Sequence, residues 1–181
     1  MKFIFPCKAY EQKAIEYVKE FHDHESEPYG CGGLERYLKN ETYSAWLEKV
    51  IHDMDVANMP EGRVPALTYF YVCEAEDKIV GMINIRLALN DFLRNEGGHI
   101  GYCIRPAERG KGYGTSMLRD ALTFCKTIGL CDILIFCDKH NIASAKVAKN
   151  CGGVLEQEFY SEVFKTDVQK YRVRSDDKYR K

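Results

Sequence analysis

The feature that most constrains this sequence is a glycine-rich turn between an apolar strand, predicted over residues 99–104, and a strongly periodic helix. The turn reads Arg109-Gly110-Lys111-Gly112-Tyr113-Gly114-Thr115. The first amides of a helix have no partner inside it, and the helix dipole places partial positive charge there. Glycine lets the main chain approach a ligand closely and adopt positive φ. The turn therefore predicts a phosphate site, with Arg109 and Lys111 adding charge.

The spacing within the turn excludes two common phosphate-binding motifs. A P-loop requires Ser or Thr directly after its Gly-Lys pair, whereas Gly112 follows Lys111 here. A dinucleotide fingerprint requires G-x-G-x-x-G, and no reading of the turn supplies the third glycine. The pattern that remains is R-x-x-G-x-G, formed by Arg109, Gly112 and Gly114.

This pattern resembles the acetyl-CoA pyrophosphate loop of the GNAT superfamily of N-acetyltransferases. The preceding strand, Gly101-Tyr102-Cys103-Ile104, and its Arg105-Pro106 exit are similar to the family's strand four and its proline-bearing lead into the loop. Downstream, Asn141 opens a helix that is closed by Gly152-Gly153, as an Asn and a Gly do in the family. The specific resemblance covers residues 97–153 and implies acetyl-CoA as the co-substrate.

The resemblance also implies which residues contact acetyl-CoA. Main-chain groups of Tyr102, Cys103 and Ile104 would hold the pantetheine arm, and one amide there would face the acetyl oxygen. Main-chain N–H groups of the turn would bind the pyrophosphate: Arg109, Gly110, Lys111, Gly112, Tyr113, Gly114 and Thr115. Asn141 and Ser144 would contact the pantetheine end, and for Asn141 this role is compatible with capping its helix.

At the position of the general base, this chain departs from the family pattern. Many members carry a Glu eleven residues before the first Arg or Gln of the loop, and that position is Gly98 here. The nearby candidates are Glu96, acting through a water, and His99, whose ring titrates near neutral pH. The alternative for each is a role without catalysis, Glu96 as a loop carboxylate and His99 as a histidine at a strand edge.

The proton for the departing thiolate is also unassigned. Many members place a Tyr seven residues after the helix-opening Asn, where this chain has Ala148. Tyr102, Tyr160 or solvent would then supply the proton. Cys103 and Cys137 invite a covalent acetyl-cysteine mechanism, but that requires a lowered thiol pKa and a neighbouring base, so we favour direct transfer.

The sequence does not identify the acceptor of the acetyl group, but it favours one chemical class, the amines. Aromatic and acidic residues in the expected acceptor wall would suit a cationic amine, although core packing explains the aromatics equally well. These residues are Tyr29, Tyr37, Tyr43, Trp46, Asp91, Phe92 and Glu96. A net charge of −1 gives no field that favours nucleic acid or an anionic membrane. We expect a small-molecule or peptide amine, no nucleic acid and no membrane partner, and we leave a homodimer open.

The eight cysteines bear on the compartment and on metal binding. None forms C-x-x-C, and several fall on apolar faces of predicted elements, where a free thiol behaves as a small hydrophobe. There is no secretory signal and no apolar run long enough for a bilayer. We therefore expect a cytoplasmic protein without a metal site.

Periodicity and turn residues predict the fold. We expect an α/β domain over residues 1–181, with a mixed, mostly antiparallel central sheet of about six to seven strands and helices on both faces. The acceptor side would occupy residues 1–66, and the acetyl-CoA core residues 97–153. Strands are expected at 3–5, 67–74, 79–87, 100–104, 132–137, 154–159 and 168–174. Helical stripes are expected at 14–21, 34–38, 46–54, 117–125 and 141–151, with a loop over 90–98.

The leading hypothesis is an acetyl-CoA-dependent N-acetyltransferase that acts by direct attack of a primary amine. The alternative is a catalytically weak acyl-CoA-binding or sensing module. Gly98 and Ala148, which stand where the family often has Glu and Tyr, slightly favour this alternative.

Overall fold

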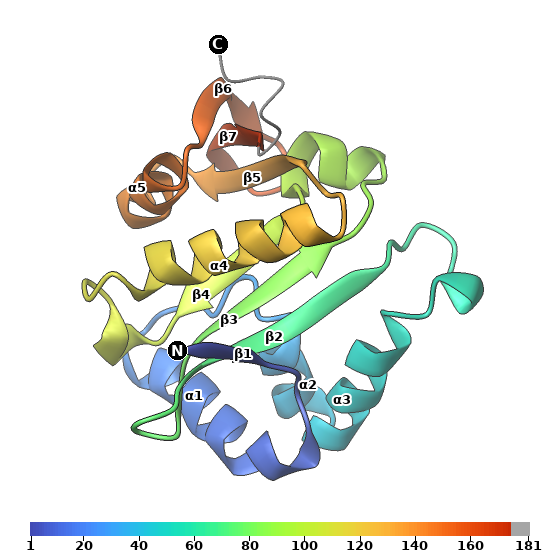
Figure 1. Cartoon of the computed structure of the whole chain (residues 1–181), viewed down its shortest axis with the longest axis vertical. Helices are drawn as coiled ribbons and strands as arrows, with labels where there is room; N and C mark the ends of the chain where they lie inside the picture. The colour runs from blue at the N-terminus through green and yellow to red at the C-terminus, as the bar shows by residue number, and fades with distance from the viewer. Residues whose placement is uncertain (175–181) are drawn as a thin grey trace. The chain divides into compact units, whose positions relative to one another are not determined.

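The computed structural model describes residues 1–174; residues 175–181, the end of the predicted 1–181 domain, lie outside the described part. Figure 1 shows the strands β1 (Lys2–Ile4), β2 (Ala66–Cys73), β3 (Lys78–Arg86), β4 (Ile100–Ile104), β5 (Asp132–Asp138), β6 (Val154–Ser161) and β7 (Thr166–Arg174). The α-helices are α1 (Glu11–Asp23), α2 (Leu34–Asn40), α3 (Tyr43–His52), α4 (Tyr113–Thr127) and α5 (Ile142–Asn150). The predicted α/β class with mostly antiparallel strands is confirmed.

The strands form two sheets, where the sequence predicted one central sheet. The first sheet has the order β1-β2-β3-β4, and the second the order β5-β7-β6. β5 takes β7 as its antiparallel partner along its whole length, from Asp132 opposite Arg174 to Asp138 opposite Val168. The chain correspondingly divides into two compact units, residues 1–88 with 101–113, and residues 89–100 with 114 onward.

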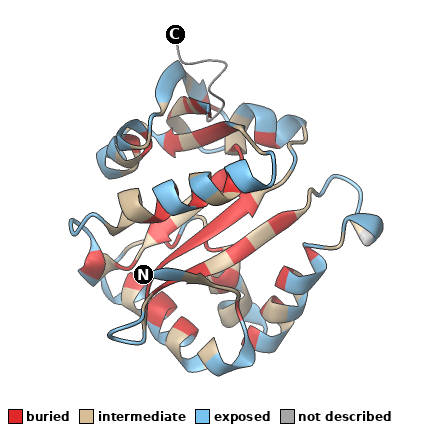
Figure 2. Cartoon of the chain, viewed as in Figure 1, coloured by how far each residue is buried: buried red, intermediate tan, exposed pale blue. Residues whose placement is uncertain are grey.

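The core of the first unit lies between its sheet and helices α1, α2 and α3, which occupy one side of the β1–β3 ribbon (Figure 1). The predicted stripe on α1 is buried at Ala14, Val18 and Phe21, whereas Ile15 faces solvent. Trp46 of α3 is fully buried and packs against Phe70 of β2, with ring centroids 5.9 Å apart. Figure 2 shows this core as buried residues along β2, β3 and the sheet-facing sides of the helices.

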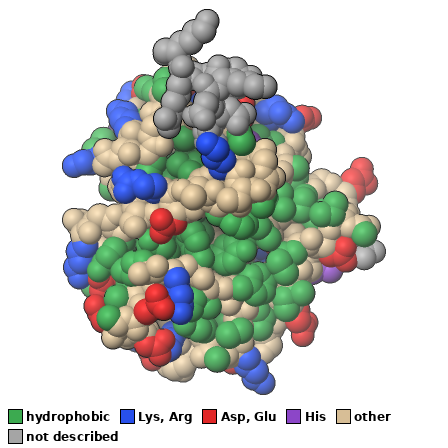
Figure 3. Space-filling view, in the orientation of Figure 1, with side chains coloured by type: hydrophobic (Ala, Val, Ile, Leu, Met, Phe, Trp, Pro, Cys, Tyr) green, Lys and Arg blue, Asp and Glu red, His purple; other side chains and the backbone are tan. Residues whose placement is uncertain are grey.

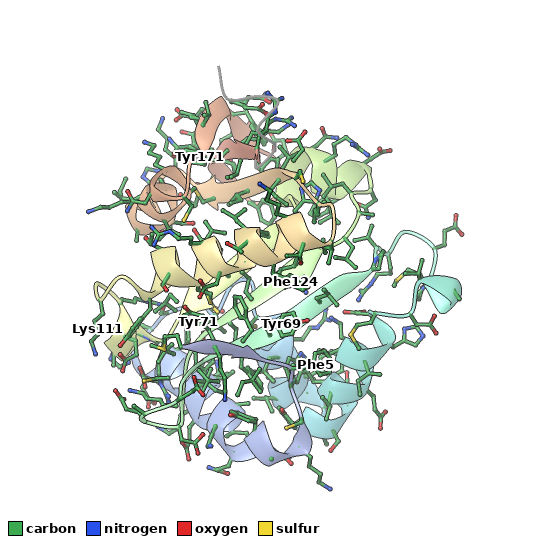
Figure 4. All side chains as sticks on the ribbon, in the orientation of Figure 1. Phe5, Tyr69, Tyr71, Lys111, Phe124 and Tyr171 are labelled. Carbon is green, nitrogen blue, oxygen red and sulfur yellow. The ribbon has the colours of Figure 1, made fainter. Side chains whose placement is uncertain are left out.

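The opposite face of the first sheet carries aromatic side chains from its edge. Phe3 lies 5.7 Å from the Tyr69 ring, and Phe5 lies 6.0 Å from the same ring. Figure 3 shows hydrophobic side chains gathered over β1 and β2, and Figure 4 shows Phe5, Tyr69 and Tyr71 there. Alternation along β2 thus sends Tyr69 and Tyr71 to one face and Phe70 to the other.

A close approach of two main-chain segments joins the connection between α1 and α2 to β4. Gly30 has φ +80°, and a Cβ there would lie only 2.1 Å from the Tyr102 nitrogen. On the other side of the contact, a Cβ on Gly101 would lie 3.1 Å from the Gly30 Cα. Only a residue without a side chain fits at Gly30, because the obstructing atoms are backbone.

The second unit holds the β5–β7 sheet, α5 and most of α4. The predicted stripe on α4 is buried at Met117, Leu118, Ala121 and Cys125, whereas Leu122, also predicted to be buried, is half-buried. Gly129 follows the helix with φ +78°. In the part of the chain that the structure describes, no helix is long and apolar enough to cross a bilayer.

The loop predicted over residues 90–98 is helical instead, and this prediction was wrong. Residues 91–92 are helical and lead into a π-helix, η3 (Leu93–Gly97). The Asn90 side-chain oxygen accepts the Leu93 N–H, which supplies a cap that the polar composition concealed. Gly98, with φ +68°, ends the helix.

Candidate functional site

The glycine turn before α4 has the geometry of an open main-chain cradle. Gly110 and Gly112 have φ of +79° and +85°, and a Cβ at either position would meet no atom within 4 Å. The helix begins at Tyr113, directly after Gly112, and its first turn contains no acidic residue. The glycines are therefore required by backbone conformation, and the space beside them is open to a ligand.

The Lys111 side chain is held by a buried carboxylate of the same segment. Its Nζ lies 2.8 Å from Glu108 Oε2, and Lys78 of β3 binds the other carboxylate oxygen. Hydrogen bonds from Lys111 and Lys78 hold the pKa of the Glu108 carboxyl below its ordinary value. Figure 4 shows Lys111 at the turn that precedes α4.

The Arg109 side chain also contacts protein groups. Its guanidinium donates to the Ser26 hydroxyl at 2.7 Å and to the Ile104 carbonyl at 3.2 Å. It lies 5.4 Å from the centre of the Phe21 ring. Both basic side chains of the turn are therefore engaged with protein groups in this structure.

The predicted pantetheine strand, β4, presents different groups on its two edges. The N–H of Arg105, the residue after β4, donates to Val80 of β3 at 2.9 Å, which places that edge against β3. Alternation turns the main-chain groups of Ile104 to the opposite edge, consistent with the bond from Arg109 to its carbonyl. β4 stands at one end of the four-strand order, so this second edge is the outer edge of that sheet.

Cys103 of β4 points into the core of the first unit. Its carbonyl accepts the Tyr17 hydroxyl at 3.1 Å, and its sulfur lies 3.2 Å from the same oxygen. Burial raises the pKa of the Cys103 thiol well above its ordinary value. A thiol that stays protonated is a poor nucleophile.

His99 is a buried residue anchored to β5 by two hydrogen bonds. Its N–H donates to the Leu134 carbonyl at 2.8 Å, and its ring Nδ1 accepts the Leu134 N–H at 2.9 Å. Because Nδ1 acts as the acceptor, the neutral ring carries its proton on Nε2. Neither ring nitrogen can then take a proton from a substrate unless the bond to Leu134 breaks.

Glu96 lies on η3 in a different environment. Its side chain is half-buried, and one carboxylate oxygen, Oε2, is buried with no hydrogen-bond partner in the described chain. One turn earlier on the same helix, Phe92 is 48% exposed, and its ring lies 6.4 Å from that of Phe164 on the β6–β7 turn. A buried acceptor oxygen without a donor is costly, which marks a position where a ligand or water would supply the proton.

Asn141 and Ser144 lie at the start of α5. The Asn141 side-chain oxygen accepts the Ser144 N–H at 3.0 Å, which confirms the predicted helix cap. The Ser144 hydroxyl bonds to the thiol of Cys137, whose pKa is nevertheless raised by burial. Ala148 is fully buried on the same helix.

The remaining predicted residues fall on exposed and buried positions. Tyr160 on β6 is exposed, and Tyr102 on β4 is half-buried. The aromatic acceptor wall divides between core and surface, because Tyr43 and Trp46 are buried whereas Tyr29 is 76% exposed. Core packing is therefore the account of Tyr43 and Trp46. Among residues 1–174, no three His, Cys, Asp or Glu side chains gather as a metal site would require.

Sequence reasoning missed the carboxylates that hold this region. Glu108 stands directly before the basic turn, so an acid between Lys78 and Lys111 had a local signal in the Pro-Ala-Glu lead-in. Glu20 of α1, which accepts the Ala107 N–H, is distant in sequence and had none.

Comparison with known proteins identifies relatives of this fold. A model of the acetyltransferase (GNAT) domain matches residues 11–154. The ribosomal-protein-S5-alanine acetyltransferase of Vibrio fischeri is 18% identical, with a TM-score of 0.71 over 97% of this chain and 93% of that one. The Microcin C7 self-immunity acetyltransferase MccE, solved with acetyl-CoA and AMP, is 18% identical with a TM-score of 0.69 over 96% and 91%.

A third similar structure is RimL, a ribosomal L7/L12 alpha-N-protein acetyltransferase in complex with coenzyme A. It is 16% identical, with a TM-score of 0.68 over 95% of this chain and 92% of that one. No match was found among curated protein sequences. At these identities the solved structures support the fold.

Proposed function

This chain belongs to the GNAT acetyltransferase family, and we propose that it transfers the acetyl group of acetyl-CoA directly to a primary amine. The observation that carries the proposal is the open cradle of Gly110 and Gly112 at the start of α4. Main-chain N–H groups at such a turn suit a pyrophosphate, and open space above both glycines suits the close approach that it requires.

The acetyl group needs a donor for the oxygen on which charge develops during attack. From the resemblance, we assign this to one main-chain N–H of β4 within the segment from Tyr102 to Ile104. The resemblance assigns the pantetheine end to Asn141 and Ser144, and the cap bond between them leaves the Asn141 amide nitrogen to act as a donor.

The amine must lose a proton to attack, and we assign its removal to Glu96, directly or through a water. The buried Oε2 of Glu96 supports this choice. His99 is the weaker candidate because Leu134 already occupies the nitrogen that would accept the proton. Tyr102, Tyr160 and solvent remain the candidate sources of the proton for the departing thiolate.

Attack by the amine itself, without an acetyl-cysteine, is supported by the state of two thiols. Burial raises the pKa of both Cys103 and Cys137, so neither is poised as a thiolate near neutral pH. Intact-mass analysis after incubation with acetyl-CoA alone should show no acetyl adduct on the protein.

A second candidate function is a catalytically weak acyl-CoA-binding or sensing module. Gly98 favours it, because a Cβ there would lie 2.5 Å from the Leu134 carbonyl oxygen and no side chain can occupy the position. Fully buried Ala148 supplies no acid. Measuring the release of free CoA with a panel of amines distinguishes the two functions. An acetyltransferase releases CoA when its amine is present, whereas a sensor binds CoA without turnover.

The cofactor assignment is tested by calorimetry of CoA with Gly112→Ala. Loss of one or two charge-assisted main-chain bonds should weaken binding by about tenfold to a hundredfold. Gly129→Ala is the matched control, because Gly129 also has positive φ (+78°) and open space around its Cβ position but lies after α4. Equal CoA affinity in the two variants would refute the assignment.

A further inference from the structure

Helix α1 carries a row of side chains that contact β4 and the segment leading to the glycine turn. Tyr17 donates to the Cys103 carbonyl, and the Phe21 ring lies beneath the Arg109 guanidinium. Glu20 lies between them in sequence, on the same side of the helix, since residues three and four apart are neighbours. Figure 1 shows α1 beneath the turn that precedes α4.

Glu20 binds the lead-in segment at two consecutive points. One oxygen, Oε2, accepts the Arg105 Nε at 2.6 Å, and the other, Oε1, accepts the Ala107 N–H at 2.9 Å. Arg105 is itself fixed, because it donates to the Ile79 carbonyl at 3.2 Å and its side chain is only 9% exposed. Although partial burial acts to raise it, bonds from Ala107 and Arg105 hold the pKa of Glu20 below its ordinary value.

The hydrogen bond from Ala107 to Glu20 lies just before the glycine turn in the chain. Pro106 has no N–H, so Ala107 carries the first main-chain donor after Arg105. The short helix η4 (Pro106–Glu108) follows, and Gly110 opens the turn. The Ala107 donor thus lies just before the two flexible glycines whose N–H groups we assign to the pyrophosphate.

We propose that Glu20 is a positioning residue for acetyl-CoA binding, which holds the lead-in segment so that the glycine turn presents its N–H groups to the pyrophosphate. The proposal rests on the proposed function, because it assumes that the turn binds this group. Glu20 itself touches no ligand. Its loss should therefore weaken recognition of the pyrophosphate half of CoA and spare the pantetheine half.

The test compares the full chain with its Glu20→Gln and Glu16→Gln variants by calorimetry. Glu16 is the matched control, since it is exposed one turn earlier on α1 and its carboxylate accepts only from Gln12 among the bonds identified. The ligands are CoA, 3′-phospho-ADP, which contains the pyrophosphate, and pantetheine, which lacks it. Glu20→Gln should weaken CoA and 3′-phospho-ADP by the same factor, about tenfold, and leave pantetheine unchanged. Glu16→Gln should match the wild type for all three.

Each other outcome overturns a defined statement. If the wild type binds CoA and Glu20→Gln binds it equally well, the role of Glu20 is wrong and the proposed function still stands. Equal loss for both halves, with a lower unfolding temperature, makes the role of Glu20 structural and also overturns the inference. No CoA binding by the wild type overturns the proposed function and the inference with it.

Glu20→Asp is the second variant if Glu20→Gln does not fold. Its shorter carboxylate keeps the charge beside Arg105 but cannot reach both donors. It should fold and show a smaller loss on the same half of the ligand, and unchanged binding of 3′-phospho-ADP would overturn the inference.

Discussion

At the scale of single residues, Glu96 and His99 differ in what their acceptor atoms already bind. Glu96 keeps a buried oxygen without a donor in the described chain, and we expect Glu96→Gln to lower kcat by about a hundredfold or more. CoA affinity should stay unchanged, because the substitution leaves the glycine turn intact. The measurement is turnover with an amine identified from the panel. Exposed Glu162 provides the control Glu162→Gln, and loss of turnover in both variants would contradict a specific role for Glu96.

His99 should stabilise the folded protein, because its ring Nδ1 accepts the Leu134 N–H. His99→Ala leaves the buried Leu134 N–H without its partner, at a cost of about 1–3 kcal/mol in the free energy of unfolding. In His99→Asn, the side-chain oxygen can stand near the place of Nδ1, so much of this stability should return. Denaturant unfolding of the three proteins measures the effect. If His99→Asn is as unstable as His99→Ala, the bond to Leu134 is not the cause.

At the scale of elements, η3 and the glycine after it explain why the expected Glu is displaced. Gly98 has φ +68°, and its Cβ would meet the Leu134 carbonyl oxygen at 2.5 Å. Gly97 is a matched neighbour, since the nearest atoms to its Cβ would all be side-chain atoms, the end of Leu93 at 2.7 Å and the Phe92 ring at 3.6 Å. We expect Gly98→Ala to lower the free energy of unfolding by at least about 1–2 kcal/mol more than Gly97→Ala. If thermal or denaturant unfolding shows equal losses of stability for the two variants, the contact of the new Cβ with the Leu134 carbonyl has no cost and this account is wrong.

The same elements show how far the sequence predicts this fold. Strand β4 has the predicted bounds, and the stripe on α4 is buried as predicted, because both depend on local periodicity. η3 was missed because its start depends on one side-chain cap at Asn90 within a polar segment. Of the candidate site, the glycine turn was visible as a local motif. Two contacts of this region were not visible, since Ser26, which binds Arg109, and Lys78, which binds Glu108, reach it only through the tertiary fold.

At the scale of the whole molecule, periodicity predicted the strands but not their division into two sheets, because strand order depends on pairings distant in sequence, such as β5 with β7.

Stability against acid also belongs to this scale. Several carboxyl groups have folded-state pKa values below the ordinary range, among them Glu20, Glu108 and Glu158. A lowered pKa contributes stability that is fully present above the unfolded-state pKa of about 4.3 and is lost as the pH falls through the folded-state value.

We therefore expect Tm to fall as the pH is lowered from about 5 to 3. The difference in Tm between the wild type and Glu108→Gln should be largest at pH 7 and should close in acid, because both proteins then carry an uncharged side chain. Glu158→Gln should show a smaller difference, since the Glu158 side chain is 37% exposed, against 6% for Glu108, and solvent screens its pair with Lys139. A Tm difference for Glu108→Gln that does not vary with pH would contradict this account.

The contact between Gly30 and Gly101 has a consequence for how this sequence can diverge. Both positions disfavour a side chain, because a Cβ on Gly30 would overlap the main chain of β4 and a Cβ on Gly101 would lie 3.1 Å from the Gly30 Cα. A substitution at either site alone is penalised, so the pair should be inherited together. Descendants that lose one glycine should also have changed the length or course of the α1–α2 connection. An alignment of such descendants would therefore record the contact as correlated change at two sites 71 positions apart (101 − 30).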